Sequence, residues 1–216
     1  MSATLVSVQV GPVRDLGTAE AGDPMDRPWR SGFYKDPVAG FVRVEHDHVA
    51  GDGQADLVNH GGPDKAVLAY SLQGYEAWRG ELDAAGLVPG AFGENLTIDG
   101  QHEAGVCVGD VLRIGTVTLE VSQPRQPCWK LGRRWRQKAL PARVMATGRT
   151  GWYFRVREPG RLAAGDAVVL ADRPFPGLTI AALNDMMYGR APATAAAAGC
   201  PALSNGWRSH LAGLVE

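Results

Sequence analysis

The sequence predicts a mainly β fold, a barrel or sandwich with long loops, followed by a short helical tail. Three observations support this prediction. Up to about residue 170, short apolar segments alternate with period two, as half-buried strands do. Most of the 28 glycines and 14 prolines lie before residue 178 and separate these segments, which is typical of β folds. Past residue 172, apolar residues recur at helical spacing instead.

The strand predictions rest on three segments. TLVSVQV, residues 4–10, is apolar and rich in β-branched residues, and GFVRVEHDH, residues 40–48, alternates in the same way. VLRIGTVTLEVSQ, residues 111–123, predicts two short strands around a glycine turn.

Two helices are expected within this β region. One covers SLQGYEAWRGELDAAGL, residues 71–87, where apolar residues follow one another at steps of three and four. They are Leu72, Tyr75, Trp78, Leu82 and Ala85. The second helix covers WKLGRRWRQKAL, residues 129–140.

The tail begins where DRPFPG, residues 172–177, interrupts the strand pattern. Thr179 can cap a helix through residues 180–189, and two further short helices are expected within residues 192–200 and 204–215. So few residues bury little surface alone. We therefore predict a β domain over residues 1–172 and a three-helix domain over residues 173–216 that packs against it.

Composition narrows the classes of partner. A net charge of −1 gives no overall attraction to nucleic acid or to an anionic membrane. The sequence has no signal-peptide pattern and no apolar run near the roughly 20 residues that span a bilayer. We therefore expect a cytoplasmic protein. The basic run KLGRRWRQK, with Trp129 and Trp135 interleaved, keeps nucleic-acid binding as a weaker alternative to an anion pocket or a solvated helix face.

The three cysteines are interpreted one at a time. An odd, sparse set argues against a disulfide framework, and the absence of a CxxC pair removes the ligand set of a zinc–thiolate site or an iron–sulfur cluster. Cys107 lies between valines and is expected in the core. Cys200 lies in an alanine-rich tail, where we expect no function.

Cys128 stands in a different setting. Pro124 and Pro127 restrict the backbone before it, and residues 121–143 hold seven basic side chains and no acidic one. Positive charge and a helix that begins at Trp129 would favour the thiolate. A thiolate in a stiff cationic loop is a candidate nucleophile or soft-metal ligand. The alternative is a packed cysteine at a strand end.

The segment VNHGGPDKAV contains a second candidate site. His60 precedes Gly61 and Gly62, and such a turn lets the backbone approach a ligand closely. Backbone N–H groups there, with Lys65 close by, can bind an anion. An ordinary tight turn is the alternative, and the spacing of a phosphate-binding P-loop is absent.

Two further patterns are weaker. In AFGENLTIDG, Gly93, Glu94 and Asn95 precede a short strand and suffice to build a turn. His46 and His48 share one face of the strand predicted over residues 40–48, which suits a two-histidine metal pair. No third ligand is identifiable, so a solvated strand or turn is the better interpretation.

Taken in order, several of these segments resemble the MOSC domain, named for the C-terminal domain of molybdenum-cofactor sulfurases. The matching motifs are MDRPWRSGFYKDPV, GDGQADLVNHGGPDKAVLAY, FGENLT, VGDVLRIG and VSQPRQPC. The resemblance covers residues 5–170 and implies a barrel-like β fold that binds a molybdenum cofactor. The tail is similar to the small three-helix domain of a bacterial branch that includes reductases of N-hydroxylated bases such as 6-N-hydroxylaminopurine.

The resemblance also implies roles for single residues. The family's cysteine after PRxP is the molybdenum ligand, which here is Cys128. The anionic pyranopterin carries a phosphate and two dithiolene sulfurs, which need cations and backbone donors. The expected cofactor contacts are Arg125, Lys65, Asn95, Gly61 and Gly62, with Trp29, Ser31 and Lys35 as a further wall. His60 and Asp64 are the alternatives for a proton donor.

The function implied is a molybdenum-dependent reductase that cleaves the N–O bond of N-hydroxylated compounds. Because the chain has no flavin fingerprint and no cluster motif, electrons are expected from a separate reductase. The alternative is a protein without turnover, in which Cys128 holds the cofactor or carries sulfur as a persulfide. Whether the protein forms a homodimer stays open.

Overall fold

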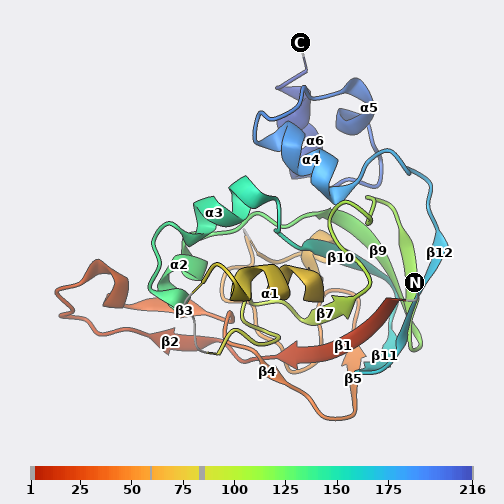
Figure 1. Ribbon diagram of the computed structural model, residues 1–216. Helices are drawn as coiled ribbons and strands as arrows, with labels where there is room; N and C mark the ends of the chain where they lie inside the picture. The colour runs from red at the N-terminus through yellow and green to blue at the C-terminus, as the bar shows by residue number, and fades with distance from the viewer. Residues whose placement is uncertain (1–2, 59, 83–85, 216) are drawn as a thin grey trace.

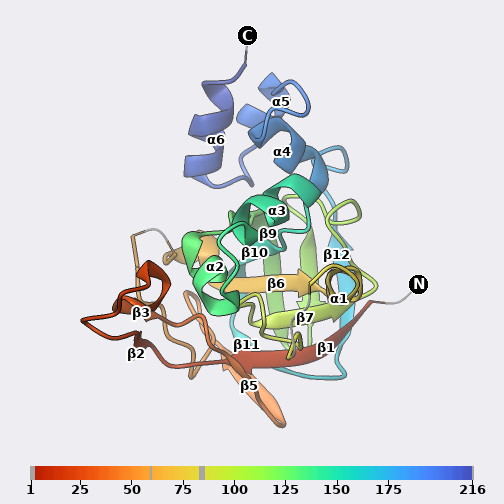
Figure 2. The same ribbon diagram turned by 60° about the vertical axis from the view of Figure 1, so that its left-hand side comes forward.

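A computed structural model of the protein describes residues 3–58, 60–82 and 86–215. A closed β barrel forms its centre, with three short helices on one side and three more at one end (Figures 1 and 2). Within these ranges, no helix has the length and apolar character needed to cross a membrane.

The barrel has seven strands in the order β12-β8-β9-β10-β6-β7-β1, and pairing of β1 with β12 closes it. The strands are β1 (Ala3–Val10), β6 (Val67–Ser71), β7 (Leu96–Asp99), β8 (Val111–Ile114), β9 (Val117–Pro124), β10 (Trp152–Glu158) and β12 (Ala167–Asp172). Neighbours are antiparallel except β6 and β7, which run parallel. The helix α1 (Leu72–Arg79) lies between these two in the chain, as a parallel crossover requires. The predicted mainly β barrel is confirmed.

The barrel interior explains the period-two pattern of the sequence. Apolar side chains from successive strands meet there with no exposed surface, among them Leu5, Leu96, Leu119 and Phe154. Alternation places every second residue of a strand on this inner face.

Smaller strands surround the barrel, and two short 3₁₀ helices accompany them. The strands are β2 (Arg14–Leu16), β3 (Trp29–Ser31), β4 (Asp36–Pro37), β5 (Phe41–Val44) and β11 (Gly160–Ala163); the 3₁₀ helices are η1 (Pro24–Asp26) and η2 (Pro63–Lys65). β2 pairs with β3, β4 extends the sheet beside β1, and β5 pairs with β11.

The strand predicted over residues 40–48 is shorter than expected. β5 ends at Val44, and the chain turns so that the Glu45 N–H donates to the carbonyl of His48. The ring of His48 contacts the carboxylate of Asp47 at 2.6 Å. His46 and His48 therefore lie in a solvated turn, the interpretation that the sequence favoured, and not on one face of a strand.

The helix predicted over residues 129–140 is also divided. α2 (Trp129–Trp135) ends at Arg136, whose φ of 50° is left-handed, and α3 (Leu140–Thr147) follows. The N–H of Gln137 donates to the carbonyl of Gly132 at 2.9 Å, which closes the first helix. Two helices with a sharp turn replace one because both can then cover a second, aromatic core.

This second core lies under α1, α2 and α3. Tyr70 stacks on Phe92 with ring centroids 4.4 Å apart, and Tyr75 and Trp78 of α1 pack beside them. α1 ends at Arg79, earlier than predicted, although Leu82 is still buried. Of the five residues in the predicted apolar pattern, Ala85 lies outside the described residues.

Three helices follow the barrel: α4 (Ile180–Met187), α5 (Ala195–Ala198) and α6 (Asn205–Ala212). The Thr179 hydroxyl accepts from the N–H of Ala182 at 3.0 Å, so the predicted cap is confirmed. Leu183 and Trp207 belong to the same buried cluster as the barrel interior. The helical tail therefore packs on the barrel, while a domain boundary at residue 172 stays a prediction.

Candidate functional site

A pocket opens where the loop after β9 meets the loop before β6. Its empty volume, which includes space open to solvent, is about 630 Å³. Seven residues predicted from the sequence line it: Ser31, Lys35, His60, Lys65, Asn95, Arg125 and Cys128. The fold thus brings together residues from four separate motifs.

Cys128 is partly buried in this pocket and precedes the first residue of α2. Burial raises the pKa of its thiol, but a hydrogen bond from His60, the charge of Arg125 and the backbone N–H of Lys130 outweigh that effect. The pKa of Cys128 consequently falls to about 7. At neutral pH, a large fraction of the protein molecules therefore carries Cys128 as the thiolate. The thiolate is the form that binds soft metals and attacks electrophiles.

Arg125 contributes a cation that is only partly paired. Its backbone N–H donates to the carbonyl of Gly151 at 3.0 Å, and its Nη2 donates to the carbonyl of Phe92 at 3.1 Å. Its side-chain Nη1 is buried and has no hydrogen-bond partner within the described ranges. Since the residue is only 4% exposed, this donor is costly unless something binds it.

Lys35 and Asn95 meet at a residue that the sequence did not single out, Asp52. The ammonium of Lys35 pairs with one carboxylate oxygen of Asp52, and both side chains are less than 10% exposed. Asn95 Nδ2 donates to the other oxygen at 2.9 Å. Burial lowers the pKa of Lys35, while the charge of Asp52 opposes this shift.

The FGEN segment owes its shape to Glu94, which has no exposed surface. Its carboxylate accepts from the Gly90 N–H at 2.7 Å and from the Tyr75 hydroxyl at 2.6 Å. Gly93 has a φ of 78°, and a Cβ there would lie 2.9 Å from the ring of Phe33. The turn predicted from these residues is therefore tightly fixed, and it directs Asn95 toward the pocket.

The pocket as a whole carries more positive than negative charge. Its cations are Lys35, Lys65, Arg125 and Lys130, and its carboxylates are Asp52 and Asp56. Burial lowers the pKa of Lys65, and the charges of Asp64 and Asp56 oppose that shift. The excess of cations favours an anionic ligand.

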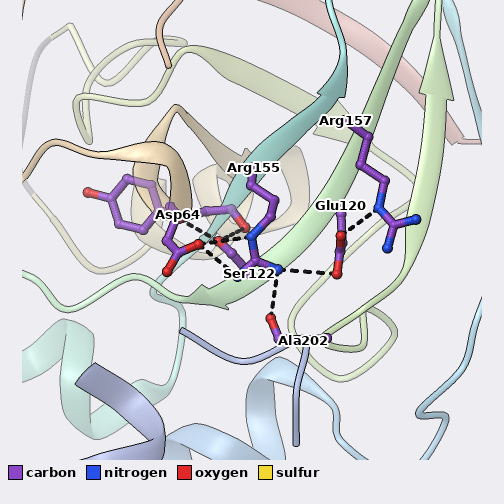
Figure 3. Close-up of polar contacts among 7 residues, drawn as sticks. Asp64, Glu120, Ser122, Arg155, Arg157 and Ala202 are labelled. Carbon is purple, nitrogen blue, oxygen red and sulfur yellow. Dashed lines mark hydrogen bonds and ion pairs between the residues drawn. The ribbon is translucent and has the colours of Figure 1, made fainter. Parts of the chain in front are cut away.

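Asp64 lies outside this lining, although it was a candidate proton donor. Its carboxylate accepts from Arg155 Nε at 2.8 Å, and Arg155 also pairs with Glu120 (Figure 3). Gly61 borders a neighbouring groove, and Gly62, with a φ of 91°, begins the turn into η2. Roles for these three residues in cofactor binding or catalysis stay predictions.

Trp29 lies beside the pocket but does not line it. Its ring packs against that of Trp129 with centroids 5.6 Å apart, and the guanidinium of Arg133 lies over both rings. Trp29 therefore forms an aromatic contact between β3 and α2, while the other two residues of the predicted wall, Ser31 and Lys35, line the pocket.

The other two cysteines, Cys107 and Cys200, are buried, and for Cys107 burial was predicted. Burial raises the pKa of the Cys107 thiol. Among the residues that the structure describes, no group of three histidine, cysteine or acidic side chains could hold a metal ion.

Sequence patterns missed two residues that shape the site. Asp52 lies within GDGQAD, a segment that matched the family motif but gave no individual role. Arg155 lies in β10, where buried and less buried residues alternate. This alternation predicts that its side chain points away from the apolar interior, but it does not predict which residues the side chain contacts. Neither pairing has a local signal, because the partners lie 17 and 91 residues away in the chain.

Residues 56–169 match the model of the MOSC domain family. This protein belongs to that family. Protein YflK of Bacillus subtilis, described as uncharacterized, is 42% identical over 174 residues, which are 81% of this chain and 78% of YflK. A protein named reductase from Gibberella moniliformis is 36% identical over 74% of this chain, and the match spans only 29% of that longer protein.

Solved structures agree with this membership. The crystal structure of YiiM from Geobacillus stearothermophilus superposes with a TM-score of 0.80, at 33% identity, covering 99% of this chain and all of YiiM. YiiM from Escherichia coli superposes with a TM-score of 0.71 at 27% identity, covering 95% of this chain and 94% of that one. The barrel and the helices after it are therefore a fold that these proteins share.

Proposed function

We propose that this protein binds a molybdenum cofactor through Cys128 and reduces N-hydroxylated compounds to amines. The observation that carries the proposal is that one pocket contains two unusual groups. The Cys128 thiol has a pKa of about 7, and the buried Nη1 of Arg125 has no hydrogen-bond partner among the described residues. One group offers a soft-metal ligand, and the other a donor for an anion.

The residues of the pocket fit such a cofactor. Its phosphate and dithiolene sulfurs are acceptors, and Arg125, Lys35 and Lys65 offer cationic donors around the same space. Cys128 supplies one thiolate for the metal, and the dithiolene would supply others. The family match and the relative named reductase support the same chemistry.

The overall reaction takes two electrons and two protons, and converts an N-hydroxylamine to an amine and water. When bound, the cofactor supplies the two-electron redox centre. The chain itself binds and orients the substrate beside Cys128, and His60 is the residue that we assign to proton delivery, since it lines the pocket and hydrogen-bonds to Cys128. Electrons come from a separate reductase.

A second candidate function is a carrier without turnover, in which Cys128 holds a persulfide or passes the cofactor to a client. The low pKa of Cys128 suits this chemistry as well, because a thiolate can attack the outer sulfur of a donor persulfide and release the donor as its own thiolate.

Metal analysis separates these functions. The protein is produced in a host that makes molybdenum cofactor, as wild type, Cys128→Ala and, as control, Cys200→Ala. We expect nearly one molybdenum per wild-type and control chain, none in Cys128→Ala, and reduction of N-hydroxylated substrates with a reduced viologen dye only where metal is present. A folded wild type without molybdenum would contradict the proposal, and one extra sulfur on Cys128 would favour the carrier.

A further inference from the structure

A groove separates the turn around η2 from the first turn of α6. Pro63, Asp64 and Lys65 border it on the barrel side, and Asn205 and Gly206 border it on the helical side. Figure 1 shows α6 among the helices at the end of the barrel. The groove is thus formed jointly by the barrel and the helical tail.

The groove adjoins the Cys128 pocket. Lys65 and Gln126 line both spaces, and the groove also contains Gly61, the residue after His60. A molecule whose reacting group lies at Cys128 can therefore extend past Lys65 into the groove. The two spaces are therefore neighbours.

A network centred on Arg155 fixes the two sides of the groove. Arg155 donates to Asp64 Oδ1 at 2.8 Å on the barrel side and to the carbonyl of Ala202 at 2.9 Å on the helical side. Glu120 holds the same guanidinium at 3.2 Å, and Ser122 donates to the carbonyls of Asp64 and Tyr153. Figure 3 shows these contacts converging from the turn, the strands and the tail. The groove is therefore preformed.

The side chains of the groove indicate what it would bind. Trp207 is 3% exposed, and Met187 adds a second apolar group. The Trp207 Nε1 is buried and has no partner in the described part of the chain. Gln123 and Ser204 are largely buried polar groups that carry both donors and acceptors. The lining also includes Asp64, Lys65 and His210, so the groove presents mainly hydrogen-bonding groups beside a smaller apolar surface. Such a lining suits a planar ring that itself carries hydrogen-bond donors and acceptors.

We propose that this groove is a substrate subsite that binds the non-reacting ring of N-hydroxylated compounds while their N–O group lies at Cys128. The inference rests on the proposed function and adds a place for the rest of the substrate. It gives the helical tail a role in specificity, because α6 supplies one wall.

A pair of leucine substitutions on α6 tests the subsite. Gly206 lines the groove, and a Cβ there would meet no atom within 4 Å, so the side chain of Gly206→Leu begins in open space. Ser209→Leu adds the same side chain at an exposed position of the same helix that does not line the groove. Comparable unfolding temperatures would show that both variants fold.

Kinetics of the molybdenum-loaded enzymes then compare a large and a small substrate. For 6-N-hydroxylaminopurine, Gly206→Leu should raise KM about tenfold with kcat nearly unchanged, the result of losing about 1.4 kcal/mol of uniform binding. For N-methylhydroxylamine, which cannot reach the groove, both constants should stay within about twofold of wild type. Ser209→Leu should match wild type with both. Equal effects on both substrates, or no effect on either, would overturn the subsite.

A binding measurement separates failure of the subsite from failure of the proposed function. Equilibrium binding of adenine to the full-length protein is measured by calorimetry and requires no turnover. We expect Gly206→Leu to weaken adenine binding about tenfold and Ser209→Leu to leave it unchanged. Adenine binding that Gly206→Leu does not weaken, or no binding to wild type, would reject the subsite whether or not the enzyme reduces N-hydroxylated compounds.

Discussion

Arg125 follows β9 and Arg155 lies in the neighbouring strand β10, but the two side chains have opposite surroundings. Arg155, in β10, pairs with Asp64 and Glu120 and donates to a backbone carbonyl. Arg125, just after β9, donates from Nη2 to one carbonyl, and its buried Nη1 finds no acceptor in the described ranges. Arg155 keeps 23% of its side-chain surface exposed, whereas Arg125 is 4% exposed.

The difference indicates what each guanidinium does. A buried donor without an acceptor costs free energy, so the Nη1 of Arg125 does not stabilise the fold in the absence of a ligand. A paired cation with several acceptors holds separate segments together. We therefore interpret Arg125 as a binding group and Arg155 as a structural one.

The largest expected effect comes from replacing Arg125. Arg125→Met removes a charged donor while keeping an apolar side chain of similar length. Hydrogen bonds to charged groups contribute about 1.5–3 kcal/mol, so the affinity for the cofactor should fall about 10- to 100-fold. The loss is measured as a lower content of molybdenum per chain after dialysis. The unfolding free energy of cofactor-free protein should change by less than about 1 kcal/mol.

Arg113→Met is the matched control for this prediction, since Arg113 is an exposed arginine on β8. It should retain wild-type molybdenum. If Arg125→Met keeps its cofactor but has a much lower unfolding free energy, the interpretation of Arg125 as a binding group is wrong.

Replacing Arg155 should have the reverse pattern. Arg155→Met leaves Asp64 and the largely buried Glu120 without this partner, and the unfolding free energy should fall by about 2 kcal/mol, below the range for fully buried pairs because Arg155 is partly exposed. Urea denaturation of cofactor-free protein measures it. Arg157→Met, on the same strand and 52% exposed, should cost less than about 1 kcal/mol. An equal loss of unfolding free energy in both variants would contradict the interpretation that Arg155 holds these segments together.

Local patterns predicted the parts of the molecule that depend on local forces. Strand alternation, the Thr179 cap and the buried setting of Cys107 follow from residues close in the chain, and the structure has all three. The break at Arg136 was missed because it depends on packing of α2 and α3 over the aromatic core. In the site, the motifs gave Cys128 and six other residues of the pocket lining. They did not single out Asp52, because its pairing with Lys35 depends on a contact 17 residues away in the chain.

The smallest expected effect concerns the acidity of Cys128, and it tests how far the pocket itself activates the thiol. In cofactor-free protein, the rate of alkylation by iodoacetamide, followed at Cys128 by peptide mass analysis, should rise with a midpoint near pH 7. His60→Phe removes the hydrogen bond to the thiolate, so the midpoint should move up by about one unit. Cys107, whose pKa is raised by burial, is an internal control that should react slowly throughout.

The sign of the linked stability follows from the same shift. Because the pKa of Cys128 is lower in the folded protein than the ordinary value of 9.0, ionisation stabilises the fold fully above about pH 9. This contribution falls as the pH drops toward 7 and is absent below it. His60→Phe should narrow that window from its lower end. An unchanged alkylation midpoint in His60→Phe would show that Arg125 and the Lys130 N–H suffice to activate Cys128, and would leave His60 with proton delivery as its only assigned role.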